Sequence, residues 1–166
     1  MAVKEILLLG NPILYQKSIA ITHDEIAFVK TIVSDLHDTL FNFRQKYNCG
    51  RAIAAPQIGV MKRLIYLNVE KPIVIINPII DQFSPEIFEL WDDCMSFPDL
   101  LVRVKRFKSC RIRFKDLNWE DHEMLIDGDL SELLQHEYDH LDGILAVQKA
   151  IDQFSFAIKS NSKLTD

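Results

Sequence analysis

The sequence has 166 residues, of which 48% are hydrophobic and 26% are charged. This composition is typical of a folded globular protein and argues against disorder, and the length suits a single domain over residues 1–166. The formal net charge of −5 provides no electrostatic footprint for nucleic acid or an anionic membrane, so we expect no DNA and no membrane partner.

The cysteine content and the length of the apolar runs indicate the cellular location that we expect for the protein. The three cysteines are an odd number, which disfavours a disulfide framework and favours a reducing compartment. The apolar run at residues 6–9 is shorter than the roughly 7 to 15 residues of a signal peptide. No stretch reaches the about 18 apolar residues of a membrane span. We therefore expect a soluble cytoplasmic protein.

The first predicted element is a long helix over residues 22–47. Thr22 and Glu25 have the spacing of a capping box, in which each residue satisfies a backbone N–H of the other. Apolar residues then recur at helical spacing, at positions 26, 29, 32, 33, 36 and 40. Gly50 is the predicted terminator.

The middle of the chain predicts strands, at residues 63–69, 73–76, 101–106, 109–115 and 124–126, with a polar break at 92–98. A second helix is predicted over residues 129–141, with Gly143 beyond its end, and a weaker one over 150–160. The expected fold class is α+β: mixed or antiparallel sheets around a central helix, with a long N-terminal helix and a C-terminal helix.

The second helix carries an H-E-x-x-H motif, formed by His136, Glu137 and His140. Imidazoles at i and i+4 lie on one helix face and can hold one metal ion, while the Glu can take a proton from water there. On a helical wheel these residues fall in the apolar stripe, opposite Ser131, Glu132, Gln135, Tyr138, Asp139 and Asp142. Because buried imidazoles and carboxylates are costly without partners, we favour a metal site over a hydrogen-bonded core network.

A catalytic metal site usually has three protein ligands and one open position. Candidates for the third ligand are His23, His37, His122, Cys49, Cys94 and Cys110. Spacing does not decide between them. Cys94 stands out because it lies in the polar break, and a thiolate is a good ligand for borderline-soft metals.

Three segments resemble the signatures of the peptide deformylase family. Residues 135–141 (QHEYDHL) are similar to Q-H-E-x-D-H-L, residues 50–57 (GRAIAAPQ) to G-x-G-x-A-A-x-Q, and residues 92–96 (DDCMS) to E-G-C-x-S. They occur in the family's order with similar separations, and the resemblance extends over the whole chain.

The resemblance implies removal of the N-formyl group from peptides that begin with formylmethionine, with release of formate. It implies one divalent metal ion, typically Fe(II), with Zn, Ni or Co able to substitute, held by Cys94, His136 and His140. Glu137 would accept a proton from water and deliver it to the leaving amine. The Gln57 side chain and the Met95 backbone N–H would stabilise the oxyanion.

The resemblance also implies a peptide cleft lined by Gly50, Arg51, Ala52, Asp93 and Leu133. The sequence departs from the signatures here, because Ala52 replaces a glycine, Asp92 replaces a glutamate and Asp93 replaces a second glycine. A carboxylate beside the predicted Cys94 thiolate favours cation retention. We hypothesise that Arg51 pairs with Asp93 or Asp92.

Three alternatives stay open. A deformylase-like amidohydrolase for a different N-formyl or N-acyl amine would turn over formyl-Met peptides poorly. A zinc protease of the H-E-x-x-H type would not need Cys94. A deformylase fold kept for binding, with little catalysis, would dock at the ribosome, for which the tail with Lys159 and Lys163 is the candidate contact.

Overall fold

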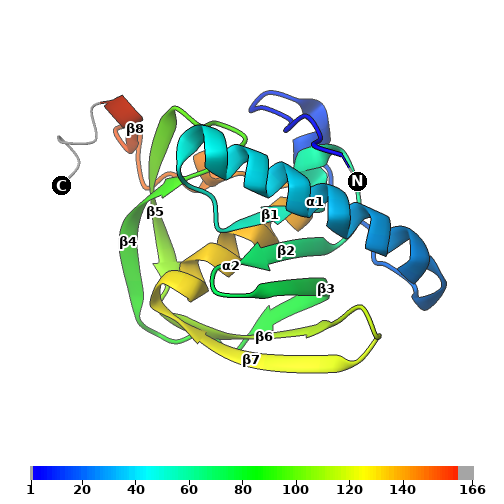
Figure 1. Cartoon of the computed structure of the whole chain (residues 1–166). Helices are drawn as coiled ribbons and strands as arrows, with labels where there is room; N and C mark the ends of the chain where they lie inside the picture. The colour runs from blue at the N-terminus through cyan, green and yellow to red at the C-terminus, as the bar shows by residue number, and fades with distance from the viewer. Residues whose placement is uncertain (1, 161–166) are drawn as a thin grey trace.

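The computed structural model describes residues 2–160, and within them the chain forms an α+β fold (Figure 1). Helices α1 and α2 span Ile26–Tyr47 and Gly128–Leu141. The strands are β1 (Ala52–Ala54), β2 (Leu64–Asn68), β3 (Pro72–Asp81), β4 (Ile87–Asp93), β5 (Leu100–Phe107), β6 (Ser109–Lys115), β7 (Asp121–Asp127) and β8 (Phe156–Ile158). Short 3-10 helices occur at Pro12–Tyr15, His23–Glu25, Ala55–Ile58 and Ala146–Lys149.

The strands form two sheets, with strand orders β1-β2-β3-β6-β7 and β4-β5-β8. Every pairing between these strands is antiparallel, so the sequence-based choice between mixed and antiparallel sheets resolves to antiparallel. Adjacent antiparallel strands need only short connections, which suits the turns between β4 and β5 and between β6 and β7.

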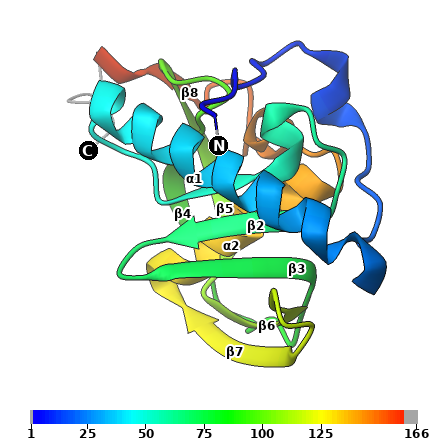
Figure 2. The ribbon, with the colours of Figure 1, turned by 45° about the vertical axis from the view of Figure 1, so that its right-hand side comes forward.

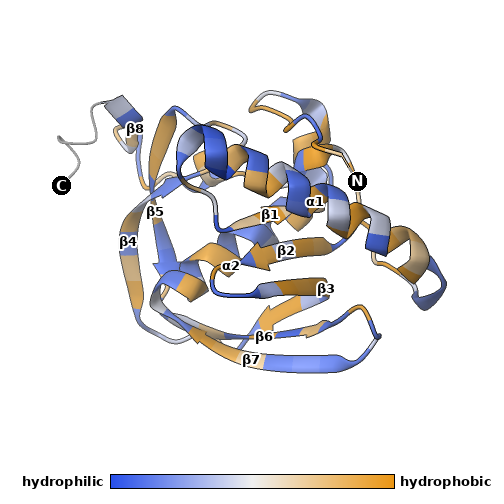
Figure 3. Cartoon of the chain, viewed as in Figure 1, coloured by the Kyte–Doolittle hydropathy of each residue, from blue (hydrophilic) through white to orange (hydrophobic). Residues whose placement is uncertain are grey.

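The two helices cover opposite faces of the five-stranded sheet (Figures 1 and 2). Side chains alternate along a strand, so Ile53 and Tyr66 pack against α1 while Ala54 and Ile65 pack towards α2. In Figure 3 the hydropathy colours alternate along α1, because only one face of that helix reaches the core. Helix α2 also contacts β5 of the second sheet, so it lies between the two sheets.

Helix α1 begins and ends near its predicted bounds. The Thr22–Glu25 capping box is present, and the Thr22 N–H donates to the Glu25 carboxylate over 2.9 Å, although the first turn is a 3-10 helix. The helix ends at Tyr47 because Asn48 adopts a left-handed conformation (φ 55°). The cap is therefore Asn48, two residues before the predicted Gly50.

Strands β3 and β4 differ from the prediction. Strand β3 continues through Asn77 and Pro78, where the register shifts and Asn77 takes a φ of 49°. The predicted polar break at 92–98 is wrong in its first part, because Asp92 and Asp93 are the last residues of β4. Cross-strand pairing with Val102 and Leu101 of β5 accommodates these polar residues in a strand.

The predicted C-terminal helix over 150–160 is wrong. The chain instead turns at residues 151–154 and forms β8, in which Phe156 pairs with Val102 of β5. Phe154, Phe156 and Ile158 alternate with polar or small residues, which is the period of a strand. Within residues 2–160, no helix is long and apolar enough to cross a membrane.

Candidate metal centre

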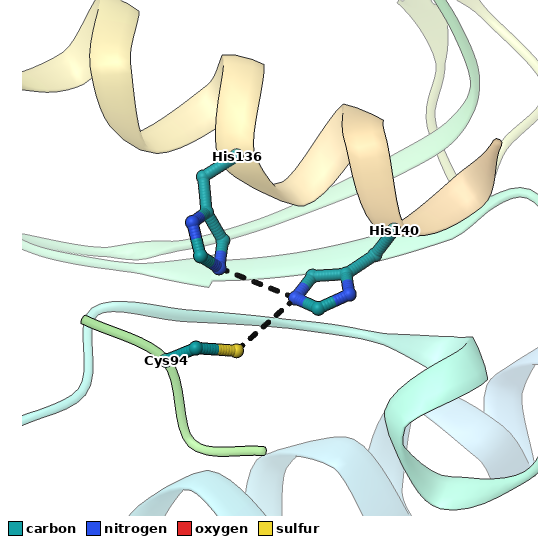
Figure 4. A group of neighbouring side chains, drawn as sticks. All are labelled: Cys94, His136 and His140. Atoms are coloured by element: carbon teal, nitrogen blue, oxygen red, sulfur yellow. Dashed lines mark hydrogen bonds between the residues drawn. The ribbon is translucent and has the colours of Figure 1, made fainter. Parts of the chain in front are cut away.

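Two elements bring together three side chains that could hold a metal ion (Figure 4). His136 and His140 project from one face of α2, and Cys94 follows the end of β4. The Cys94 Sγ lies 3.3 Å from the His140 Nε2, which lies 3.2 Å from the His136 Nε2. All three residues are buried, at 6%, 5% and 1% exposure for Cys94, His136 and His140.

This donor set fits a borderline metal ion, because a thiolate and two imidazoles are the ligands that zinc and Fe(II) accept at three-ligand sites. The three candidate ligand atoms lie within 4.8 Å of one another. Burial and the neighbouring His136 lower the pKa of His140 well below its usual value, which favours the neutral imidazole that binds metals. The His140 Nδ1 is buried without a hydrogen-bond partner in the described chain.

Helix α2 is more buried than its wheel predicts. Ser131, Glu132, Gln135 and Asp139, expected on a polar outer face, are all buried. The wheel assumes a helix with one solvent face, whereas α2 lies between two sheets. Gln135 donates its amide to the carbonyl of Phe107 over 2.9 Å, so the polar side of the helix is fastened to the end of β5.

A chain of buried charges supports His136. Its Nδ1 lies 2.9 Å from the Asp92 Oδ2, which also accepts a 3.0 Å hydrogen bond from Arg106. Arg106 donates to Asp139 over 2.6 Å, and Lys149 donates to the other oxygen of Asp139. Burial raises the pKa of Asp92, but His136 and Arg106 outweigh it and lower that pKa to about 2. Asp92 is thus an ionised carboxylate that orients the His136 ring.

Sequence reasoning missed Arg106 and Asp139. Arg106 is 2% exposed and lies on the inward face of β5 together with Val102 and Val104. The alternation of side chains along β5 could have revealed Arg106. A charged residue at the inward position that follows two inward valines requires buried counter-charges. Asp139 and Asp92 are those counter-charges, and they raise the pKa of Arg106 against its burial.

Glu137 is 4% exposed and lines the same cavity as Cys94 and His136. Its Oε2 has no hydrogen-bond partner in residues 2–160, and burial raises its pKa to about 7. A carboxyl group with this pKa can both accept and release a proton near neutral pH, which is what general acid–base chemistry requires.

Gln57 and Met95 lie next to Cys94 and line the same cavity. The Gln57 Oε1 accepts a 2.9 Å hydrogen bond from the Ala54 N–H, which fixes the amide. Its Nε2 donates only long bonds, 3.5 Å to the Cys94 Sγ and 3.3 Å to the Ser96 Oγ. Among the described residues, no acceptor is recorded for the Met95 backbone N–H. Both donors are therefore available to another acceptor.

A cavity of about 200 Å³ joins these groups. Its walls include all five residues expected to line a cleft: Gly50, Arg51, Ala52, Asp93 and Leu133. Gly50 has a φ of 113°, and an added Cβ would lie 3.3 Å from Leu40, so this position requires glycine. Ala52 and Asp93 lie in strands without positive φ, so the replaced glycines are not needed for the backbone here.

The hypothesised pair between Arg51 and Asp92 or Asp93 is wrong. Arg51 donates to the Glu132 Oε1 over 2.5 Å. Asp92 is occupied by Arg106, and Asp93 accepts a 2.7 Å hydrogen bond from Lys159. Glu132 lies one helical turn before His136, and this places its carboxylate on the cavity wall within reach of Arg51.

The other candidates for a third ligand lie elsewhere. His37 bonds to the hydroxyl of Tyr66, His122 bonds to Asp116, and His23 packs against Trp119. Cys110 is buried near Ser131, at 3.5 Å. Cys49 lines the cavity but does not belong to the ligand cluster.

Comparisons with known proteins agree with this geometry. The family model "Polypeptide deformylase" matches residues 3–155. The peptide deformylase of Leptospira biflexa is 34% identical over 163 residues, covering 90% of this chain and 88% of that protein. The solved peptide deformylase of Thermotoga maritima has a TM-score of 0.83 and 27% identity, covering 92% of this chain and 100% of that one. The enzyme from Synechococcus elongatus, solved in complex with actinonin, has a TM-score of 0.84 and 27% identity, covering 92% and 81%. The chain belongs to the polypeptide deformylase family.

Proposed function

We propose that this protein is a metal-dependent hydrolase that removes the N-formyl group from formylmethionyl peptides and nascent chains, releasing formate. The observation that carries the proposal is the buried cluster of Cys94, His136 and His140, which opens into a cavity shared with Glu137 and Gln57. Membership of the polypeptide deformylase family supports the same reaction.

Cys94, His136 and His140 would hold one divalent ion. When bound, this ion supplies a Lewis acid that lowers the pKa of water and polarises a carbonyl oxygen. We propose Fe(II) as the physiological ion, while Zn, Ni and Co suit the same donors. The described cysteines are all free thiols, which supports a reducing environment in which Cys94 stays able to bind metal.

Glu137 is the proposed general base and acid. Its unpartnered Oε2 would accept a proton from the attacking water and then deliver it to the amine as the bond from the formyl carbon to nitrogen breaks. The products are formate and a peptide with a free amino group, so atoms and charge balance.

Gln57 and Met95 are the proposed oxyanion donors. The Gln57 amide is held by the Ala54 N–H at one end, so its Nε2 keeps a fixed direction. The Met95 backbone N–H would be the second donor. A preorganised donor of this kind contributes about 3 kcal/mol to transition-state stabilisation. Gly50, Arg51, Ala52, Asp93 and Leu133 are the proposed peptide-binding wall.

The remaining proposals concern the setting of the reaction. The family match over residues 3–155 supports a single domain over 1–166. We propose a cytoplasmic location and docking at the ribosome, where formylated nascent chains emerge. Of the two lysines suggested for that contact, Lys159 pairs with Asp93, and Lys163 lies outside the described residues.

The experiment is a formate assay with anaerobically purified, Fe(II)-loaded protein. Formyl-Met-Ala-Ser should give one formate per peptide, whereas acetyl-Met-Ala-Ser should give no free Met-Ala-Ser. Failure to release formate with any divalent metal, while one metal ion per chain is bound, would overturn the proposal. Faster turnover of a non-peptide formamide would favour the amidohydrolase alternative instead.

A further inference from the structure

The wall of the cavity carries an ion pair next to the metal-binding cluster. Arg51, just before β1, donates to the Glu132 Oε1 over 2.5 Å, and Glu132 belongs to α2. Both residues line the same cavity as Cys94, His136 and Glu137. The Glu132 side chain is 8% exposed and that of Arg51 is 44% exposed, so the carboxylate is shielded from solvent while the guanidinium remains partly accessible to it.

The cavity is small enough for its walls to select one side chain. Its volume of about 200 Å³ is below the roughly 300 to 1,000 Å³ of sites for drug-sized ligands. If the formyl carbon lies at this cluster, the first residue of the peptide would extend along the cavity. The side chain of that residue therefore meets the walls, of which Arg51 and Glu132 form a part.

The pair has hydrogen-bonding capacity to spare. Only one guanidinium nitrogen of Arg51 and one oxygen of Glu132 form a hydrogen bond recorded within residues 2–160. An apolar side chain would remove water from this pair without replacing its hydrogen bonds, which costs free energy. A side-chain amide can donate to the carboxylate and accept from the guanidinium at the same time.

We infer that the Arg51–Glu132 ion pair makes the cleft favour formylated peptides whose first side chain ends in a group that both donates and accepts hydrogen bonds. The inference rests on the proposed function and refines its substrate class. Formylmethionyl peptides remain substrates, and a carboxamide of similar length, as in glutamine, is turned over faster. Arg51 and Glu132 are specificity-determining residues and take no part in the chemical step.

The test compares formyl-Gln-Ala-Ser with formyl-Met-Ala-Ser, using the Fe(II)-loaded protein. Sites that hydrogen-bond a substrate group discriminate strongly against analogues that lack it, and the half-open pair here predicts about a tenfold preference for Gln in kcat/KM. The double variant R51L/E132L should reverse the preference to Met. E132Q, which keeps the side-chain shape, should lower the preference if the double variant does not fold.

A matched control is the ion pair between Arg103 and Glu89, which has the same 2.5 Å separation and lies outside the cavity. E89L/R103L should leave the Gln to Met ratio unchanged. A wild-type preference for Met, or an equal ratio in wild type and R51L/E132L, would overturn the inference.

Binding of the product peptides Gln-Ala-Ser and Met-Ala-Ser, measured by calorimetry, separates this inference from the proposed function. Tighter binding of Gln-Ala-Ser that is lost in R51L/E132L supports the inference even if no formate is released. Equal binding of both peptides by the wild type overturns it even if formate release is fast.

Discussion

The two sides of the cleft hold their charges in different ways. On the inner side, Asp92 and Arg106 are 4% and 2% exposed and belong to one network that ends at His136. On the outer side, which we call the mouth, Arg51 pairs with Glu132 and Lys159 pairs with Asp93. The side chains of these two cations are 44% and 32% exposed. Buried charges that lose a partner destabilise strongly, whereas exposed pairs contribute little. The inner side is therefore suited to fixed chemistry, and the mouth can vary with the substrate.

The largest expected effect comes from breaking the inner network. Arg106→Met removes the buried cation that Asp92 and Asp139 share, so the free energy of unfolding should fall by about 3–5 kcal/mol, even though Lys149 still bonds to Asp139. Urea unfolding of the metal-free and metal-loaded protein measures it. Arg103→Met, which breaks an exposed pair on the same strand, is the control and should cost less than about 1 kcal/mol. Equal losses of unfolding free energy in the two variants would contradict the difference between the buried network and the exposed pair.

The next effect concerns Gln57, the proposed oxyanion donor. Gln57→Ala should lower kcat by about 100- to 1,000-fold, or about 3 kcal/mol, because the amide contacts the reacting oxygen only in the transition state. Metal content should stay at one per chain, measured by atomic absorption. Gln153→Ala, at an exposed position, should retain wild-type kcat. A wild-type kcat in Gln57→Ala would show that this residue does not stabilise the oxyanion.

A smaller effect is expected from the carboxylate behind His136. Asp92→Asn should weaken metal binding by about 10- to 100-fold, since carboxylates that orient a metal-binding histidine contribute this much. Competition with a chelator measures the affinity. Asp93→Asn is the matched control, because Asp93 is the next residue and bonds to Lys159 instead. Similar losses in both variants would show that general charge, rather than ring orientation, sets the affinity.

The smallest effect belongs to the mouth. Lys159→Met breaks the Asp93 pair, in which both side chains are partly exposed, so the free energy of unfolding should change by less than about 1 kcal/mol. Urea unfolding at low and high salt measures this change. A loss as large as that of Arg106→Met would contradict the view that the two sides of the cleft differ.

The sequence predicts the parts of the site that depend on local geometry. His136 and His140 face the same way because residues four apart share a helix face. The place of Cys94 is harder to predict from sequence, because this residue is brought to α2 only by the pairing of β4 with β5. Spacing left six candidates for that ligand; the polar context favoured Cys94, and the resemblance to a known family selected it.

The parts that sequence reasoning missed depend on how elements pack. The wheel of α2 predicts a solvent face, yet the second sheet covers it and buries Asp139. Arg106 reads as an ordinary strand residue until β5 is placed against α2. The pairing of Arg51 with Glu132 likewise joins residues 81 positions apart, beyond any local pattern. Helical spacing can be predicted from the sequence of one element, whereas these contacts depend on how two elements pack against each other.

The most direct test of the central claim is the activity of Glu137→Gln, in which the proposed general base is lost and the side-chain shape is kept. Fe(II)-loaded wild type and variant should bind one metal ion per chain equally. Formate release from formyl-Met-Ala-Ser should then fall by about 100- to 10,000-fold in the variant, because only the proton-transfer step is removed. Full formate release by a metal-loaded Glu137→Gln protein would contradict the account.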